Sequence, residues 1–229
     1  MNRDYEIIDV CHTIHDGMIT YKGLPPPVIS DHLTRERSRG HYAPGTEFHI
    51  GRIEMVANTG TYLDSPFHRY PEGTDLAGLS LYSVANLDGV VIRRDVAAPR
   101  AIEPAAFASL ELKDKAVLFH TGWDWRWRTE AYSDGTHPFI TADAAELLVA
   151  KGAALVGIDS YNIDNTATGE RPAHSVLLAA NIPIVEHLCG LGDLPDGDFR
   201  FFAVPVKVKN FGTFPVRAFG IVSKSTSAL

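Results

Sequence analysis

Cysteine and long apolar runs are scarce in this chain of 229 residues. Its two cysteines, Cys11 and Cys189, are too few for a disulfide framework, so we expect two free thiols and a cytoplasmic protein. The N-terminal stretch MNRDYEIIDVCHTIHDG has acidic residues and histidines where a signal peptide needs an apolar core. No run approaches the roughly 18 apolar residues that a membrane span requires. We therefore expect no membrane partner.

Basic clusters are also absent. The 21 Lys and Arg residues are outnumbered by 28 Asp and Glu residues, and no Lys/Arg-rich run occurs. Nothing in the chain would collect counter-ions from a phosphate backbone, so a nucleic-acid partner is not expected. The hydrophobic fraction of 45% and the charged fraction of 21% are typical of an ordinary soluble globular protein.

The chain is organised without internal repeats or linker-like stretches, which predicts a single domain over residues 1–229. Its first ninety residues favour strands and loops. YEIIDV (5–10), HIGRIEMVA (49–57) and GVVIR (89–93) are strand candidates. The prolines of LPPP (24–27) cannot donate to a β-ladder, so this segment is expected to be an extended loop.

The middle of the chain alternates between strand and helix patterns. AVLFH (116–120) and ALVGI (154–158) are short apolar runs, as in strands covered on both faces. TADAAELLVAKG (141–152) lies between them and has the pattern of a capped helix, which predicts a parallel β-α-β unit. AHSVLLAAN (173–181) and IPIVE (182–186) repeat helix then strand.

The C-terminal part returns to strand patterns, in FRFFAVPV (199–206) and FPVRAFGIV (214–222). Together these segments predict an α/β fold with one mixed sheet and flanking helices.

The segment NTGTYLDSPFH (58–68) concentrates groups that could carry chemistry. Gly60 permits a backbone conformation closed to other residues, and Pro66 stiffens the exit from the turn. Asp64 and His68 then project from a constrained loop, where catalytic groups are commonly mounted. A plain polar turn, with Asp64 as a cap and His68 on the surface, is the alternative.

His174 and Glu186 form a second group of this kind. The helix that His174 begins carries the chain away by about 10 Å, and the following strand returns by a comparable distance to Glu186. The two side chains are thus expected at the same end of the fold. A helix N-terminus disfavours imidazolium, so we expect a neutral His174 able to bind a metal. Two solvated polar residues are the alternative.

These segments resemble the signatures of a known family. NTGTYLDSPFH aligns without a gap with H-x-G-T-H-x-D-x-P-x-H, which marks the cyclase family of metal-dependent hydrolases, including kynurenine formamidase and isatin hydrolase. GIDSYNID (157–164) and AHSVLLAANIPIVEHL (173–188) resemble its second and third signatures, and the resemblance extends from residue 9 to residue 222. It implies a mixed, barrel-like α/β domain that assembles as a homodimer or homotetramer.

The resemblance also implies a metal site from which two ligands have been replaced. In the family, the first two motif histidines and the aspartate hold one metal, and the same aspartate with the downstream His and Glu completes the site. Here Asn58 and Tyr62 occupy the histidine positions. Neither supplies a good ligand for Zn or Mn, so a dinuclear site is not expected. Asp64, His174 and Glu186 would hold at most one divalent ion, Zn or Mn, and no organic cofactor is expected.

Other polar and aromatic residues could contribute to the pocket. Asn58, Trp123 and Trp125 are candidates for substrate contact, although packing in a core or at a subunit interface is the usual role of an aromatic run such as WDWRW (123–127). His49 could reach the site if its strand register allows. Six further histidines without motif support are expected at the surface: His12, His15, His32, His41, His137 and His187.

The leading hypothesis is a hydrolase that acts on a C–N bond (amide, formamide or lactam) or a lactone in a small aromatic or carbonyl-rich metabolite. A single metal, His68 or both would activate water, with Asp64 as ligand or orienting group and Tyr62 stabilising the oxyanion. Two alternatives remain open. One is a metal-independent lyase, cyclase or isomerase that uses His68 and Tyr62, and the other is a binder of small molecules without turnover.

Overall fold

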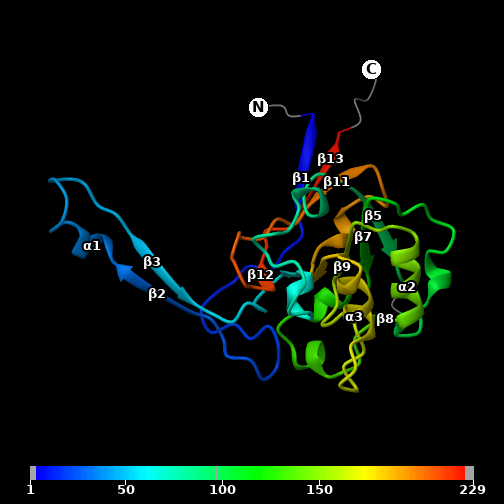
Figure 1. The fold of residues 1–229 in the computed structure, drawn as a ribbon. Helices are drawn as coiled ribbons and strands as arrows, with labels where there is room; N and C mark the ends of the chain where they lie inside the picture. Colours follow the sequence, from blue (N-terminus) through cyan, green and yellow to red (C-terminus); the bar gives the residue numbers. More distant parts are fainter. Residues whose placement is uncertain (1–3, 96, 225–229) are drawn as a thin grey trace.

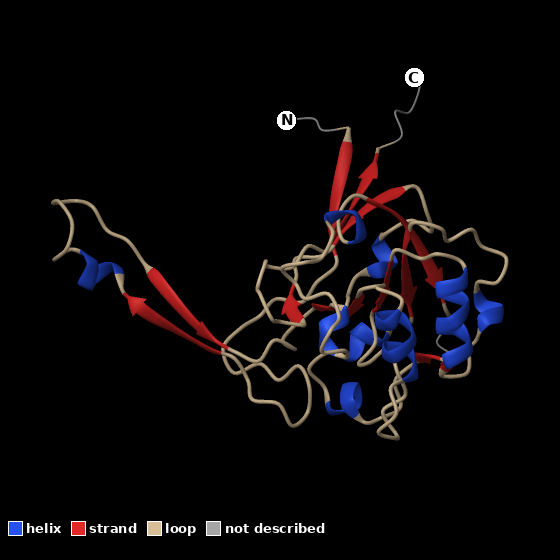
Figure 2. Ribbon diagram, viewed as in Figure 1, coloured by secondary structure: helices blue, strands red, loops and turns tan. Residues whose placement is uncertain are grey.

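A curled, mixed β-sheet forms the body of the protein (Figures 1 and 2). The computed structural model describes residues 4–95 and 97–224. In spatial order, the nine strands of the sheet are β1 (Tyr5–Asp9), β13 (Phe219–Ser223), β11 (Phe199–Phe202), β5 (Leu87–Arg93), β7 (Lys115–His120), β9 (Leu155–Ile158), β10 (Ile184–Glu186), β4 (Tyr62–Asp64) and β12 (Thr213–Pro215). The four strands β5, β7, β9 and β10 run parallel, and the outer strands pair antiparallel. The mixed α/β sheet predicted from the sequence is confirmed; the assignment of residues 1–229 to one domain stays a prediction.

The two edges of the sheet come close together, which explains its barrel-like curl. Residues 216–218 alone connect β12 at one edge to β13 near the other, and three residues span at most about 10 Å. The Val216 N–H donates to the Thr61 carbonyl, and the Val10 N–H donates to the Ala218 carbonyl, 3.0 Å in both cases. The connection is therefore tied to both edges.

The central strands separate two apolar cores. In β7, Val117 and Phe119 pack with the helices, whereas Leu118 faces the core on the other side of the sheet. The first core is covered by α2 (Ala142–Ala150) and α3 (Pro172–Ala179), which also pack against each other. This burial on both faces accounts for the continuous apolar runs in the sequence.

Both predicted crossovers are present. The chain passes from β7 through α2 to β9, and from β9 through α3 to β10, and each strand pair is parallel. Thr141 caps α2 by accepting a hydrogen bond from the Ala144 N–H at 3.2 Å, and Gly152 follows the helix with φ of +70°.

A long two-stranded arm extends away from the body (Figure 1). It consists of β2 (Val28–Leu33) and β3 (Ile50–Glu54), with α1 (Arg35–Ser38) at its far end. The strand predicted within residues 49–57 is therefore confirmed, but it belongs to the arm and not to the main sheet. Ile29 and Ile53 face each other across the arm and are 44% and 50% exposed, so neither is covered within this chain.

Two predicted C-terminal strands are shorter than expected. The segment predicted at 199–206 leaves the sheet after Phe202, and Pro205 has no N–H with which to continue a ladder. The segment predicted at 214–222 is divided between β12 and β13 by the connection at 216–218.

The remaining elements are short. They are the parallel pair β6 (Ala101–Ile102) and β8 (Phe139–Ile140), and the 3₁₀ turns η1 (Pro66–His68), η2 (Leu81–Ser83), η3 (Pro104–Ala106), η4 (Trp123–Arg126), η5 (Glu130–Ser133) and η6 (Leu191–Asp193). Both cysteines are free thiols. Across residues 4–95 and 97–224, no helix combines the length and apolar character needed to cross a membrane.

Candidate functional site

Asp64 ends β4 and is fully buried. Its strand pairs with β12 so that Asp64 lies opposite Thr213, whose hydroxyl donates a hydrogen bond to Asp64 Oδ1. The other carboxylate oxygen, Oδ2, is also buried but has no hydrogen-bond partner among the described residues. An unpaired carboxylate oxygen in the interior is costly, so Asp64 Oδ2 is suited to bind a cation or to accept a further hydrogen bond.

His68 lies four residues further on, in η1, a turn that Pro66 begins. The Thr213 hydroxyl has one proton and donates it to Asp64, so it must accept a hydrogen bond from His68 Nδ1–H, at 2.8 Å. Nε2 of the neutral ring is then an unprotonated acceptor. The side chain of His68 is 36% exposed, so this nitrogen belongs to the accessible part of the site.

Gly212 allows this arrangement because it lets the chain before β12 approach η1. A Cβ atom at position 212 would lie 2.5 Å from the backbone nitrogen of His68, a separation that no side chain could accommodate.

His174 lies in the first turn of α3 and is oriented by Asp164. Asp164 Oδ2 accepts hydrogen bonds from His174 Nδ1–H at 2.6 Å and from the His174 backbone N–H at 3.1 Å. Its Oδ1 accepts from the Ala173 N–H at 2.7 Å. This carboxylate leaves His174 Nε2 pointing into the site, 3.7 Å from Asp64 Oδ2 and 3.7 Å from Glu186 Oε1. A carboxylate behind an imidazole is the usual support of a metal-ligating histidine.

Negative charge dominates the buried part of the site. Asp64, Asp164 and Glu186 are all buried near His174. Burial alone would lower the pKa of His174, but the charges of Glu186 and Asp64 and the hydrogen bond to Asp164 raise it to about 10. The expectation of a neutral His174 is therefore wrong for the site without a cation, because nearby carboxylates outweigh the helix N-terminus. Burial also raises the pKa of Glu186.

Tyr62 and Glu186 begin a buried chain of hydrogen bonds. The Tyr62 hydroxyl donates to Glu186 Oε2 at 2.7 Å, and Glu186 Oε1 accepts from the Ile163 N–H at 2.7 Å. Nε2 of His187 lies 3.3 Å from the Tyr62 oxygen, and the Tyr132 hydroxyl lies 2.8 Å from His187 Nδ1. Because Tyr62 gives its proton to Glu186, His187 must donate to Tyr62, and Tyr132 must donate to His187.

The three aromatic side chains in this series of hydrogen bonds, Tyr62, His187 and Tyr132, are neutral. Burial raises the pKa of Tyr62 and of Tyr132 well above 10, and lowers the pKa of His187 to about 3. Each hydrogen bond in the chain therefore points toward Glu186.

Three histidines that were predicted at the surface are buried or half-buried. His137 and His187 are fully buried, and half-buried His12 stacks on Trp127 with ring centroids 3.8 Å apart. The expectation that they lie at the surface is wrong, since each fills a place in a polar or aromatic cluster that no local pattern reveals. His49 lies on the arm, where it pairs with an aspartate of β2 at 2.7 Å, and does not reach the site of its own chain.

A cavity of about 430 Å³ opens onto this group of residues. It is lined by Tyr21, Leu24, Asn58, Tyr62, His68, Arg69, Asn162, Gly169, Glu170, Arg171, His174 and Glu186. Asn58 is thus at the cavity, as expected for a substrate-contacting residue. Trp123 and Trp125 do not line it: Trp123 is buried and donates its Nε1–H to the Tyr132 carbonyl at 3.0 Å, and Trp125 is 88% exposed.

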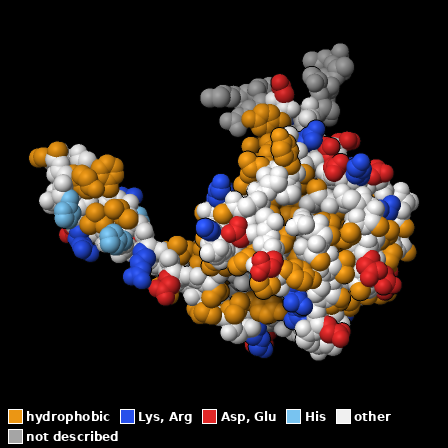
Figure 3. All heavy atoms as spheres, in the orientation of Figure 1, with side chains coloured by type: hydrophobic (Ala, Val, Ile, Leu, Met, Phe, Trp, Pro, Cys, Tyr) orange, Lys and Arg blue, Asp and Glu red, His pale blue; other side chains and the backbone are white. Residues whose placement is uncertain are grey.

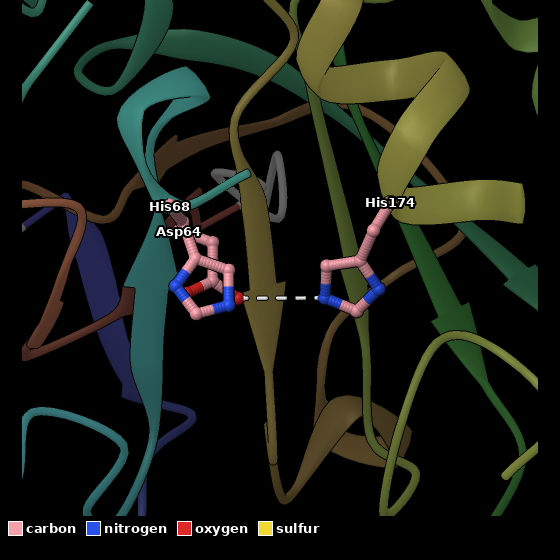
Figure 4. Close-up of side chains that lie close together, drawn as sticks. All are labelled: Asp64, His68 and His174. Atoms are coloured by element: carbon pink, nitrogen blue, oxygen red, sulfur yellow. Dashed lines mark ion pairs between the residues drawn. The ribbon is translucent and has the colours of Figure 1, made fainter. Parts of the chain in front are cut away.

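Asp64, His68 and His174 form a candidate metal-binding group. One ligand atom from each lies within 4.8 Å of the others, and Figure 4 shows their side chains meeting from β4, η1 and α3. The set fits a divalent cation on two observations: the buried Asp64 Oδ2 lacks a partner, and the imidazole nitrogens and carboxylate oxygens are ligands that Zn and Mn accept. Glu186 lies near His174 but outside this group of three.

The carboxylate of Asp164 and the hydroxyl of Thr213 are the two functional groups that the motifs did not single out. Asp164 stands in the segment GIDSYNID, which resembles a family signature, so its position carried a signal. Thr213 carried none.

Comparisons with known proteins identify the family of this chain. A family model described as "Putative cyclase" matches residues 8–165. The chain is 32% identical over 164 residues to a kynurenine formamidase of Erythrobacter litoralis, covering 72% of this chain and 73% of that protein. It is 26% identical over 219 residues to a kynurenine formamidase of Bacillus cytotoxicus, covering 93% and 96%.

Solved structures share the fold. Isatin hydrolase A from Labrenzia aggregata superposes with a TM-score of 0.81 at 22% identity, covering 96% of this chain and 94% of that one. A protein described as a potential metal-dependent hydrolase with cyclase activity superposes with a TM-score of 0.76 at 25% identity, covering 95% and 98%.

Proposed function

Because the chain belongs to the Cyclase family, we propose that it is a hydrolase that cleaves the C–N bond of an amide, formamide or lactam in a small aromatic metabolite. The observation that carries the proposal is the open cavity whose lining includes His68, His174 and Glu186 beside the unpaired carboxylate oxygen of Asp64. The kynurenine formamidase relatives support amide hydrolysis in an aromatic compound.

We propose that Asp64, His174 and Glu186 hold one divalent cation, Zn or Mn. His174 Nε2 lies 3.7 Å from Asp64 Oδ2 and 3.7 Å from Glu186 Oε1. When bound, such a cation polarises a carbonyl group and makes a water molecule more acidic. The Asp164 carboxylate holds Nδ1–H of His174, which would leave Nε2 available to such a cation.

His68 is proposed to transfer the protons. Its Nδ1–H is held by Thr213, which is in turn held by Asp64, so Nε2 is free to accept the proton of the attacking water. The same nitrogen would return the proton to the leaving nitrogen as the C–N bond breaks, which releases an acid and an amine. The order Asp64, Thr213, His68 fixes both the tautomer and the direction of the ring.

Tyr62 is less suited than Asn58 to bind the substrate oxygen. The one proton of the Tyr62 hydroxyl is donated to Glu186, so an oxyanion role would require that hydrogen bond to break. The Asn58 side chain lines the same cavity, and its amide can donate a hydrogen bond to a carbonyl oxygen. We assign Asn58 to substrate binding on this basis.

The test is an assay of the purified protein with formyl-anilides, lactams and lactones, together with elemental analysis. We expect hydrolysis of a formyl-anilide that a chelator abolishes and that Zn or Mn restores. Asp64→Asn should lose both the metal and turnover, whereas Lys224→Gln, at the far end of the described chain, should lose neither. Failure of the metal-loaded protein to hydrolyse any of these compounds would refute the proposed function. Full hydrolysis without metal would instead support activation of water by His68 alone.

We also propose that the chain forms a homodimer or homotetramer through its arm. A two-stranded ribbon is marginally stable alone, yet β2 and β3 leave Val28, Ile29, Ile50 and Ile53 between 44% and 54% exposed. Figure 3 shows hydrophobic side chains on the arm, with positive and negative groups beside them. A second copy of the chain would cover them, and light scattering should give a mass at least twice the 25.0 kDa of one chain.

A further inference from the structure

Two arginines, Arg69 and Arg171, line the cavity that contains His68 and His174. Neither forms an ion pair with a carboxylate in the described ranges of the chain. Five other arginines do form such pairs: Arg39 with Glu47, Arg52 with Glu54, Arg93 with Asp196, Arg200 with Asp88, and Arg217 with Asp9. The cavity therefore holds two guanidinium groups that lack a carboxylate partner.

Both guanidinium groups are anchored around the start of α3. Arg171 directly precedes the helix, and its Nη1 donates to the Thr168 carbonyl at 2.8 Å and to the Glu170 carbonyl at 2.6 Å. Arg69 follows His68, and its Nε lies 3.4 Å from the Ser175 hydroxyl in the first turn of α3. These bonds engage Nη1 of Arg171 and Nε of Arg69, and a guanidinium has five N–H donors.

The cavity that Arg171 lines also has an aromatic wall. The Tyr21 ring, which lines it, stacks on Tyr161 with centroids 4.5 Å apart. Arg171 is half-buried, so part of its charge is removed from water without a counter-ion. A planar anion with two oxygens is the partner that a guanidinium binds best.

We propose that Arg69 and Arg171 form a subsite for a carboxylate carried by the substrate, separate from the bond that is cleaved. The inference rests on the proposed function and adds a substrate class to it: an amide or formamide whose aromatic part carries a carboxylate. Because both arginines line the cavity wall around the start of α3, they would also set the direction in which such a substrate binds.

Glu170 opposes this selectivity. Its carboxylate lines the same cavity and is exposed, so it weakens the positive field of the two arginines. Glu170→Gln should therefore strengthen the preference for an anionic substrate, and this gives the proposal a second, opposite test.

The experiment compares two formyl-anilides that differ only in bearing a ring carboxylate or a carboxamide at the same position, with meta and para isomers of each. The wild type should favour one carboxylate isomer in kcat/KM by about 10–100-fold, the usual worth of hydrogen bonds to a charged group. Arg69→Gln and Arg171→Gln should each lower this ratio about tenfold, and Glu170→Gln should raise it. Arg200→Gln, a surface variant away from the cavity, should leave the ratio unchanged. Raised ionic strength should also lower the ratio.

Equal kcat/KM values for the carboxylate and the carboxamide in every isomer would overturn the subsite, and so would Arg variants that leave the ratio unchanged. If no formyl-anilide is hydrolysed, the proposed function fails, and calorimetric binding of aromatic carboxylates and their carboxamides then tests the subsite separately. Tighter binding of the carboxylate that Arg171→Gln abolishes would support the subsite. Equal binding of the two compounds would refute it.

Discussion

Replacing Tyr62 with Phe removes a single buried hydroxyl and keeps the ring that fills the core. The hydroxyl donates to Glu186 Oε2 at 2.7 Å and lies 3.3 Å from His187 Nε2, and the residue is 1% exposed. The change therefore leaves a carboxylate oxygen and an imidazole N–H buried without partners. It should lower stability without creating a cavity larger than one oxygen atom.

The magnitude follows from these two groups. Each buried polar group that loses its partner costs about 1–3 kcal/mol, so Tyr62→Phe should lower the free energy of unfolding by about 2–6 kcal/mol. For a chain of this length, 1 kcal/mol corresponds to about 2–4 °C in the melting temperature. The melting temperature should thus fall by at least about 4 °C. Thermal and urea unfolding with a fixed excess of chelator measure this without a contribution from bound metal.

The direction of the hydrogen bonds also predicts a coupling free energy between the hydroxyls of Tyr62 and Tyr132. Tyr132 donates to the same His187 ring that donates to Tyr62, so the two hydroxyls are coupled through one imidazole. Tyr132→Phe should also destabilise the protein, and the double variant should deviate from the sum of the single effects by about 0.5–3 kcal/mol.

Tyr82→Phe is the matched control, because Tyr82 is 91% exposed and its loss of a hydroxyl should change stability by less than about 0.5 kcal/mol. Additive effects of Tyr62→Phe and Tyr132→Phe would refute the coupled chain. A Tyr62→Phe variant as stable as the Tyr82→Phe control would refute the cost assigned to the two orphaned groups.

Three further predictions concern the metal, the base and the arm. His68→Ala should lower turnover by about 10²–10⁴-fold while metal content, measured by elemental analysis, is retained; loss of the metal would make His68 a ligand instead. The unmodified protein should bind at most one transition-metal ion per chain, and His174→Ala should abolish that binding. The double change Asn58→His plus Tyr62→His should add a second binding event in a metal titration. Two tightly bound ions in the unmodified protein would contradict this prediction. Ile53→Asp should shift the mass measured by light scattering toward 25.0 kDa without unfolding the body, and an unchanged mass would exclude the arm as the interface.

The central part of the fold was predictable because its signals are local. The buried interior of β7 and all of β9 are apolar because both faces of these strands are covered, and α2 carries its own cap at Thr141. The arm was not predictable, because β3 has a strand-like sequence but packs against no core of its own chain. A strand pattern predicts extended backbone, whereas placement in the main sheet depends on contacts that the local sequence does not contain.

The residues of the candidate site were likewise predictable only where they stand in local sequence motifs. Asp64, His68, His174 and Glu186 stand in motifs, and the structure brings all four to one place. Thr213 approaches Asp64 across 149 positions of sequence, and its role depends on the register of β4 with β12. No short pattern around Thr213 could have revealed it.

Position 62 shows why a replaced residue must be interpreted with its neighbours. Tyr in place of a ligand His would be expected to leave a gap in the site, and the sequence offered an oxyanion role for its hydroxyl. The structure gives that hydroxyl two partners, since it donates to Glu186 and accepts from His187. Asn58 and Tyr62, the two replaced positions, line the same cavity as Glu186. Restoring only the histidine at position 62 would break these hydrogen bonds without completing a second set of metal ligands. The Tyr62→His variant should therefore bind no additional metal, and it should be less stable than the variant with both Asn58→His and Tyr62→His.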